Sequence, residues 1–146
     1  MKVAIASDHG GNALRKELIE LLKEMKLDYV DLGPETDDSV DYPDYAKPVA
    51  EGVANGTYDR GILVCGTGIG MSIAANKVEG IRCALVHDVY TAHATREHND
   101  SNIIAMGGRV IGGALARDIV KTWLTTEFEG GRHERRIEKI TAIEQQ

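Results

Sequence analysis

Short apolar runs alternate with helical stretches along almost the whole chain, and this alternation limits the fold more narrowly than any other feature. Five runs have the length and composition of strands: residues 3–7, 29–32, 62–64, 81–86 and 102–106. Stretches with helical character follow them: residues 12–25, 45–55, 69–76, 90–97, 111–125 and the first part of 132–146. Strands separated by helices predict an α/β fold with a five-stranded, mostly parallel sheet that is covered on both faces.

Size and charge exclude several classes of protein. The 146 residues are enough for one domain, expected to span residues 1–146. No apolar stretch approaches the length of a membrane span, and residues 1–6 resemble a first strand rather than a secretion signal, so we expect a cytoplasmic protein without a membrane partner. A formal net charge of −6 argues against nucleic acid as a partner.

Cys65 stands where the third predicted strand meets a glycine loop, residues 66–70, and a predicted helix. A thiol at this junction faces free backbone N–H groups, which favour the thiolate and can stabilise an oxyanion beside it. The alternative is a tight strand-to-helix turn that merely needs glycine. The loop has neither the glycine spacing of a dinucleotide site nor the Lys-Ser/Thr pair of a P-loop. Because Thr67 shares the loop with Cys65, we favour the functional interpretation.

Two further segments carry candidate binding residues. Asp8 and His9 follow the first strand, where they could either bind a ligand or simply cap the next helix. Arg132 and Arg136 stand four residues apart on one helical face, and an anion between them would turn their repulsion into a gain. A solvated charged helix is the alternative for this pair.

Among the histidines, His98 is the candidate acid–base group, because imidazole titrates near neutral pH. The alternative is that its segment only ends a helix, capped by Asn99 and Asp100. The spacing of the histidines fits no standard metal motif, so no metal site is expected. The remaining candidates are expected at the surface or in an interface: His87, His93 and His133.

Together these segments resemble the type B ribose-5-phosphate isomerases, which are distinct from the type A enzymes of the same activity. The resemblance extends nearly from end to end and is carried by residues 7–11, 41–43, 65–70, 74–77, 96–100, 107–110 and 130–133. It implies a three-layer α/β/α Rossmann-like fold and interconversion of ribose 5-phosphate and ribulose 5-phosphate without a metal or an organic cofactor. It also implies a homodimer with shared active sites, with a dimer of dimers as a further option and the segment 130–146 packing on or reaching toward the partner.

The resemblance also assigns roles to residues. The residue matching Cys65 is the base, the residues matching Thr67 and His98 assist ring opening, and the glycine loop holds the enediolate. The positions that would contact the phosphorylated sugar are Asp8, His9, Tyr42, Gly66, Gly68, Ile69, Gly70, Asn99, Arg109, Arg132 and Arg136. A second branch of the family uses a glutamate base at the position of Met71, so this chain resembles the cysteine branch.

Two other functions stay open at this point. The same family includes isomerases of six-carbon aldose 6-phosphates, such as allose and galactose 6-phosphates, and pocket depth rather than any motif separates them. A non-catalytic module that binds sugar phosphates is the alternative outside the enzymes. The presence of Cys65, Thr67 and His98 together favours an enzyme.

Overall fold

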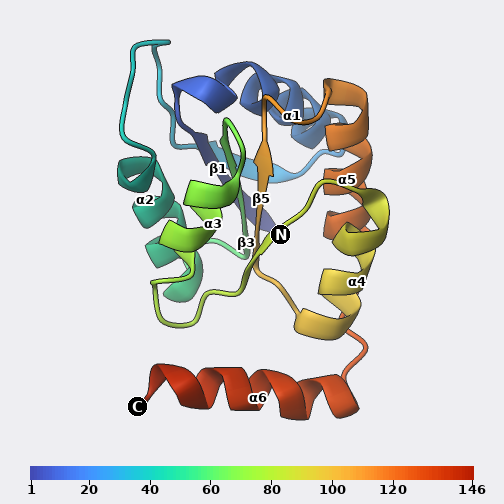
Figure 1. Cartoon of the computed structure of the whole chain (residues 1–146). Helices are drawn as coiled ribbons and strands as arrows, with labels where there is room; N and C mark the ends of the chain where they lie inside the picture. Colours follow the sequence, from blue (N-terminus) through green and yellow to red (C-terminus); the bar gives the residue numbers. More distant parts are fainter.

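The computed structural model describes all 146 residues and contains one parallel five-stranded sheet between two helical layers (Figure 1). The strands are β1 (Lys2–Ser7), β2 (Asp28–Asp31), β3 (Arg60–Cys65), β4 (Cys83–Leu85) and β5 (Ile103–Gly107). The helices are η1 (His9–Gly11), α1 (Asn12–Glu24), α2 (Tyr42–Ala54), α3 (Ile69–Ala75), α4 (Val89–Asn99), α5 (Gly113–Thr125) and α6 (Arg132–Glu144). The predicted fold class is confirmed.

The two faces of the sheet carry separate apolar cores, because successive side chains of a strand point to opposite sides. Ile62 and Val64 of β3 face the layer of α1 and α5, where Trp123 is the largest fully buried side chain. Leu63 and Cys65 face the layer of α2 and α3. Strands that are buried on both faces therefore appear in the sequence as continuous apolar runs.

The strand order, β2-β1-β3-β5-β4, places the direction change of the chain between β1 and β3. From β1 the chain first adds β2 on one side and then returns to add β3 on the other. The segments that follow β1 and β3 therefore diverge at the carboxyl edge of the sheet, which is where ligands bind in open α/β sheets.

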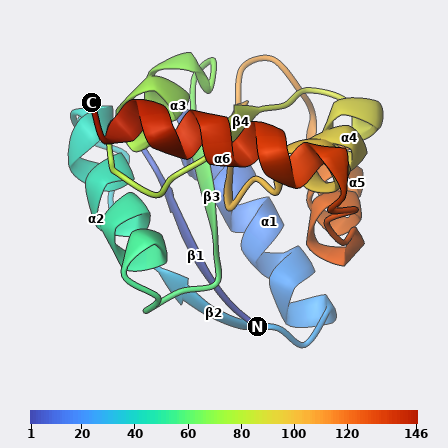
Figure 2. The same ribbon diagram turned by 90° about the horizontal axis from the view of Figure 1, so that it is seen from below.

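Helix α6 lies apart from both layers. It crosses beneath the amino ends of the strands, at the opposite end of the molecule from the glycine loop (Figures 1 and 2). Its last turn is fixed to the body by Glu144, whose carboxylate accepts hydrogen bonds of 3.2 and 3.3 Å from the N–H of Gly80. None of the helices is long and apolar enough to cross a membrane.

Candidate active site

Cys65 is the last residue of β3 and lies beside Gly107 of the neighbouring strand β5. It is 5% exposed, and its Sγ accepts a hydrogen bond of 3.1 Å from the N–H of Gly68. This donor is available because Gly68 has a φ of +78°, a left-handed conformation that turns the loop back over the sulfur. A thiolate at this position would be held by a backbone donor that the fold keeps in place.

The loop after Cys65 presents further donors. The N–H groups of Gly66, Thr67 and Gly70 donate to no other group of the chain. The hydroxyl of Thr67 is exposed, and its Oγ1 accepts a hydrogen bond of 3.2 Å from the N–H of Ile69. Free amide donors beside a thiol can bind an anion that forms within reach of the sulfur.

The segment that follows β1 lies against this loop. A Cβ built on Gly10 would come within 3.3 Å of both Asp8 Oδ1 and the backbone N of Gly66, and within 3.5 Å of Nη2 of Arg109. Asp8 is held by the N–H of Gly10, which donates to its Oδ1 over 2.9 Å. Carboxylate, guanidinium and loop amides therefore converge at the carboxyl edge between β1 and β3.

His9 and Tyr42 complete this group. The N–H of Val40 donates to His9 Nδ1 over 3.1 Å, so the ring in its neutral form carries its proton on Nε2 and presents a donor there. Tyr42, the first residue of α2, lies against the loop, since a Cβ on Gly70 would meet its ring at 2.5 Å. Sequence reasoning missed the contact with Val40, because no local pattern links residues 31 positions apart.

Four of the predicted site residues lie elsewhere. His98 and Asn99 end α4 at the amino edge of the sheet, where Asn99 O accepts a hydrogen bond of 2.9 Å from Nε of Arg82, the residue just before β4. Arg132 and Arg136 are exposed in the first turns of α6. This helix crosses beneath the same edge of the sheet (Figure 2). Because β5 has five residues, the length of the sheet, roughly 13–17 Å, separates these four residues from Cys65 and its loop within one chain.

Of the two positions expected for His133, a surface or an interface, the surface one is wrong. The side chain is not at the surface of the chain: the residue is 7% exposed, and its ring stacks on that of His98 with centroids 4.5 Å apart. Glu129, which sequence reasoning did not single out, lies 3.2 Å from His133 Nε2. The spacing of four residues between Glu129 and His133 was the signal that could have found this pair.

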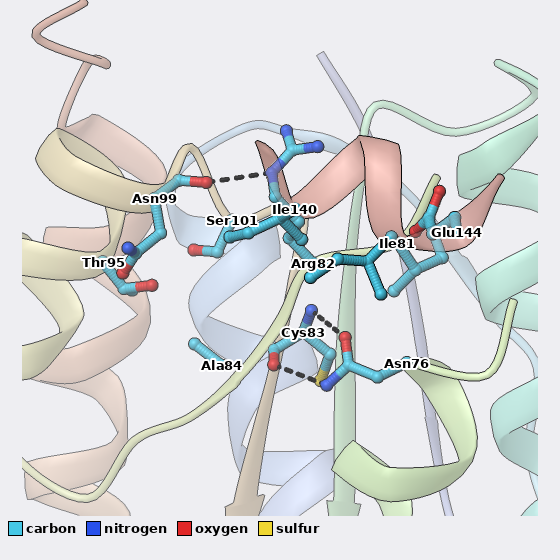
Figure 3. A pocket seen from close by; sticks show the side chains of 11 residues that line it. Asn76, Ile81, Arg82, Cys83, Ala84, Thr95, Asn99, Ser101, Ile140 and Glu144 are labelled. Atoms are coloured by element: carbon cyan, nitrogen blue, oxygen red, sulfur yellow. Dashed lines mark hydrogen bonds between the residues drawn. The ribbon is translucent and has the colours of Figure 1, made fainter. Parts of the chain in front are cut away.

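A cavity of about 460 Å³ lies between α6 and the amino edge of the sheet (Figure 3). Ile140 and Ile143 of α6 line one side, and Cys83 lines the sheet side. The side chain of Asn76 makes two hydrogen bonds to the backbone of Cys83: its Nδ2 donates to the carbonyl oxygen over 2.9 Å, and its Oδ1 accepts from the N–H over 2.8 Å. Burial raises the pKa of the Cys83 thiol to about 12. The cavity therefore holds no reactive thiol.

Comparison with known proteins agrees with this geometry. A family model described as Ribose/Galactose Isomerase matches residues 3–140. The ribose-5-phosphate isomerase B of Escherichia coli strain K12 is 49% identical over 144 residues, which cover 99% of this chain and 97% of that protein. The solved structure of ribose-5-phosphate isomerase B from Clostridium thermocellum has a TM-score of 0.98 and 54% identity, covering 99% of this chain and 98% of that one.

A further solved structure, ribose-5-phosphate isomerase B from Mycoplasma genitalium with bound ribulose-5-phosphate, has a TM-score of 0.96 and 44% identity over 99% of this chain and 97% of that one. The fold and these relatives define an enzyme, and specifically an isomerase. The chain belongs to the Ribose/Galactose Isomerase family, and its resemblance to the type B ribose-5-phosphate isomerases is confirmed.

Proposed function

We propose that this enzyme interconverts D-ribose 5-phosphate and D-ribulose 5-phosphate, a step of the non-oxidative pentose phosphate pathway, through an enediolate with Cys65 as the base. The observation that carries the proposal is the sulfur of Cys65 beside a loop whose amides are free to bind an anion. The names of the relatives support the pentose substrate, and the bound ribulose-5-phosphate of the Mycoplasma genitalium structure supports a phosphorylated sugar.

Moving the carbon-bound proton needs one base. The Cys65 thiolate takes the proton from C2 of the open-chain aldose, and the resulting thiol returns a proton to C1 as the C2 carbonyl forms. The proton of the C2 hydroxyl moves at the same time to the C1 oxygen, on which negative charge first develops. The free N–H groups of Gly66, Thr67 and Gly70 are the donors for that oxygen, and losing one such donor typically costs about 2.7–4 kcal/mol of barrier. No bond forms between sulfur and carbon.

The other site residues take the roles that the family resemblance assigns. Thr67 and His98 assist opening of the furanose ring. Asp8, His9, Tyr42 and Asn99 contact the sugar and its phosphate, and the phosphate is held mainly by the guanidinium groups of Arg109, Arg132 and Arg136. Holding a non-reacting group in this way contributes binding energy that orients C1 and C2 against the sulfur.

A complete site then requires two chains. One chain contributes Cys65, Thr67 and Arg109. The second chain contributes four residues that lie at the amino edge of its own sheet: His98, Asn99, Arg132 and Arg136. An exposed apolar patch beside the glycine loop supports a homodimer of this kind, because monomers rarely expose such groups together. The patch consists of Ile69, Ile73, Leu85, Val89 and Tyr90, which are 38–76% exposed. In this dimer the segment 130–146 reaches toward the partner's sheet.

An isomerase assay on a panel of aldose phosphates, run with EDTA present, tests the proposal. We expect turnover of ribose 5-phosphate to exceed that of allose 6-phosphate and galactose 6-phosphate. Preferred turnover of a six-carbon substrate would overturn the substrate assignment and leave the proton-transfer mechanism standing. Tight binding of every sugar phosphate without turnover of any would overturn the assigned activity.

A further inference from the structure

Three side chains with metal-ligating groups come together near the amino edge of the sheet, although their spacing in the sequence matches no metal motif. His98 comes from the last turn of α4, Glu129 from the segment before α6, and His133 from the first turn of α6. One ligand atom of each lies within 4.8 Å of the others. The chain brings them together because the N–H of Glu129 donates to Glu97 O over 3.2 Å, which fixes the approach to α6 against α4.

The chemistry of this trio suits a borderline divalent metal ion. Imidazole and carboxylate are common ligands of Zn²⁺ in proteins, with bonds of about 2.0–2.2 Å, which places two tetrahedral ligands about 3.3 Å apart. The distance from His133 Nε2 to Glu129 Oε2 is 3.2 Å, so this pair already has the spacing of two ligands on one ion.

His98 supplies the third ligand atom, which already lies within 4.8 Å of those of Glu129 and His133. Its imidazole is stacked on that of His133, with the ring centroids 4.5 Å apart and an interplanar angle of 19°. Arg132 and Glu134 flank His133 in the chain, so one positive and one negative side chain adjoin this histidine. Because Glu129 is exposed and His133 is buried, an ion would enter from the Glu129 side.

We propose that His98, Glu129 and His133 form a binding site for one Zn²⁺ ion or a similar transition metal, with the fourth position open to water, and that the bound ion inhibits the enzyme by capturing His98. The site itself stands on the geometry of the three side chains. Only its inhibitory effect rests on the proposed function, because it requires His98 to take part in ring opening. Inhibition by a metal ion is compatible with the expectation, implied by the family resemblance, that the reaction needs no metal.

Titration calorimetry of the full-length protein with ZnCl₂, after treatment with EDTA and its removal, tests the site. We expect one ion per chain. Glu129→Gln, at an exposed position that preserves folding, and His133→Gln are each expected to weaken binding at least about tenfold. The matched control is His93→Gln: His93 and Glu97 are the other histidine–glutamate pair four residues apart, at 2.9 Å but without a third ligand. The dissociation constant of this variant for Zn²⁺ is expected to stay within about twofold of that of the wild type.

Two outcomes of the calorimetry would overturn the site. The first is unchanged affinity in both Glu129→Gln and His133→Gln. The second is loss of binding in Cys65→Ser, which would assign the ion to the thiol instead. The activity assay then separates the two parts of the proposal: we expect Zn²⁺ to inhibit the wild type reversibly and Glu129→Gln to resist it. Binding with unimpaired turnover would overturn the inhibition and the role of His98 together, while the metal site would stand.

Discussion

Cys65 and His98 lie at opposite edges of the same sheet: Cys65 ends β3 at the carboxyl edge, and His98 lies in the last turn of α4 near the amino ends of β4 and β5. Both belong to the site that the family resemblance describes, and one chain does not bring them together. The relationship therefore makes the pairing of two chains a testable part of the mechanism.

Mixing two inactive variants tests whether the site is shared. Cys65→Ala and His98→Asn are each expected to be inactive as homodimers. In a co-expressed mixture, half of the dimers carry one copy of each variant, and each of these has one intact site, so activity should return to about a quarter of the wild-type level. Activity that stays at the sum of the two single variants would contradict a shared site. Co-expression of either variant with itself is the control.

The apolar patch beside the glycine loop should be the dimer interface. Ile73 of α3 is 57% exposed there, and a charge in its place would be buried without a partner. We expect Ile73→Glu to be monomeric in analytical ultracentrifugation and to lose most of its turnover. Leu115→Glu is the matched control, because Leu115 is 38% exposed on α5, away from the patch. If Ile73→Glu remains a dimer, the interface lies elsewhere.

The two cysteines should differ sharply toward thiol reagents. At pH 8 a thiol with a pKa of about 12 is ionised in only about one molecule in 10⁴, so Cys83 should not react. We expect iodoacetamide to modify Cys65 alone, to inactivate the enzyme, and to be slowed by ribose 5-phosphate. Peptide mass spectrometry locates the adduct. If iodoacetamide fails to inactivate the Cys83→Ser variant, modification of Cys83 rather than Cys65 causes the inactivation, and the assignment is wrong.

Gly68 should be essential for the shape of the loop. At its φ of +78° an alanine is strained by about 1–2 kcal/mol, and its Cβ would lie 2.7 Å from the backbone carbonyl carbon of Met106. We expect Gly68→Ala to lower the free energy of unfolding by more than about 2 kcal/mol and to reduce turnover. Gly112→Ala, at the N-cap of α5 with a φ of −85° and nothing within 4 Å of the new Cβ, should lower stability by no more than about 1 kcal/mol, because only the preference for glycine at an N-cap is lost. Chemical denaturation of both variants measures the difference.

The sequence predicts local elements well because strand and helix periodicities are local. The predicted strand over residues 3–7 corresponds to Lys2–Ser7, and the predicted helix over 12–25 corresponds to Asn12–Glu24. The strand predicted over 81–86 is shorter in the structure, Cys83–Leu85. Ile81 and Val86 are buried without belonging to the strand, so the apolar run in the sequence is longer than the strand itself. The short helix His9–Gly11 was missed, since three residues carry no periodicity.

The site was predictable only in part for the same reason. Cys65 and its loop are contiguous in the sequence, and they directly follow a predicted strand. This position alone is enough to predict a thiol beside free backbone N–H groups. The approach of Arg109 to Gly66 and the stacking of His98 on His133 depend on the strand order and on where α6 packs, neither of which leaves a local signal. A run as charged as residues 132–136 is compatible with a solvated helix or with an anion site, and the buried ring of His133 within it is a tertiary effect.

Isomerisation of ribose 5-phosphate in D₂O, with EDTA present, tests the central claim most directly. Because the thiol formed at Cys65 exchanges its proton with solvent, the account predicts ribulose 5-phosphate that carries deuterium at C1, and it predicts no conversion by Cys65→Ala, which should still bind the sugar phosphate. Cys83→Ala, the matched cysteine variant, should convert the substrate as the wild type does. Conversion by Cys65→Ala at a rate near that of the wild type would contradict the account.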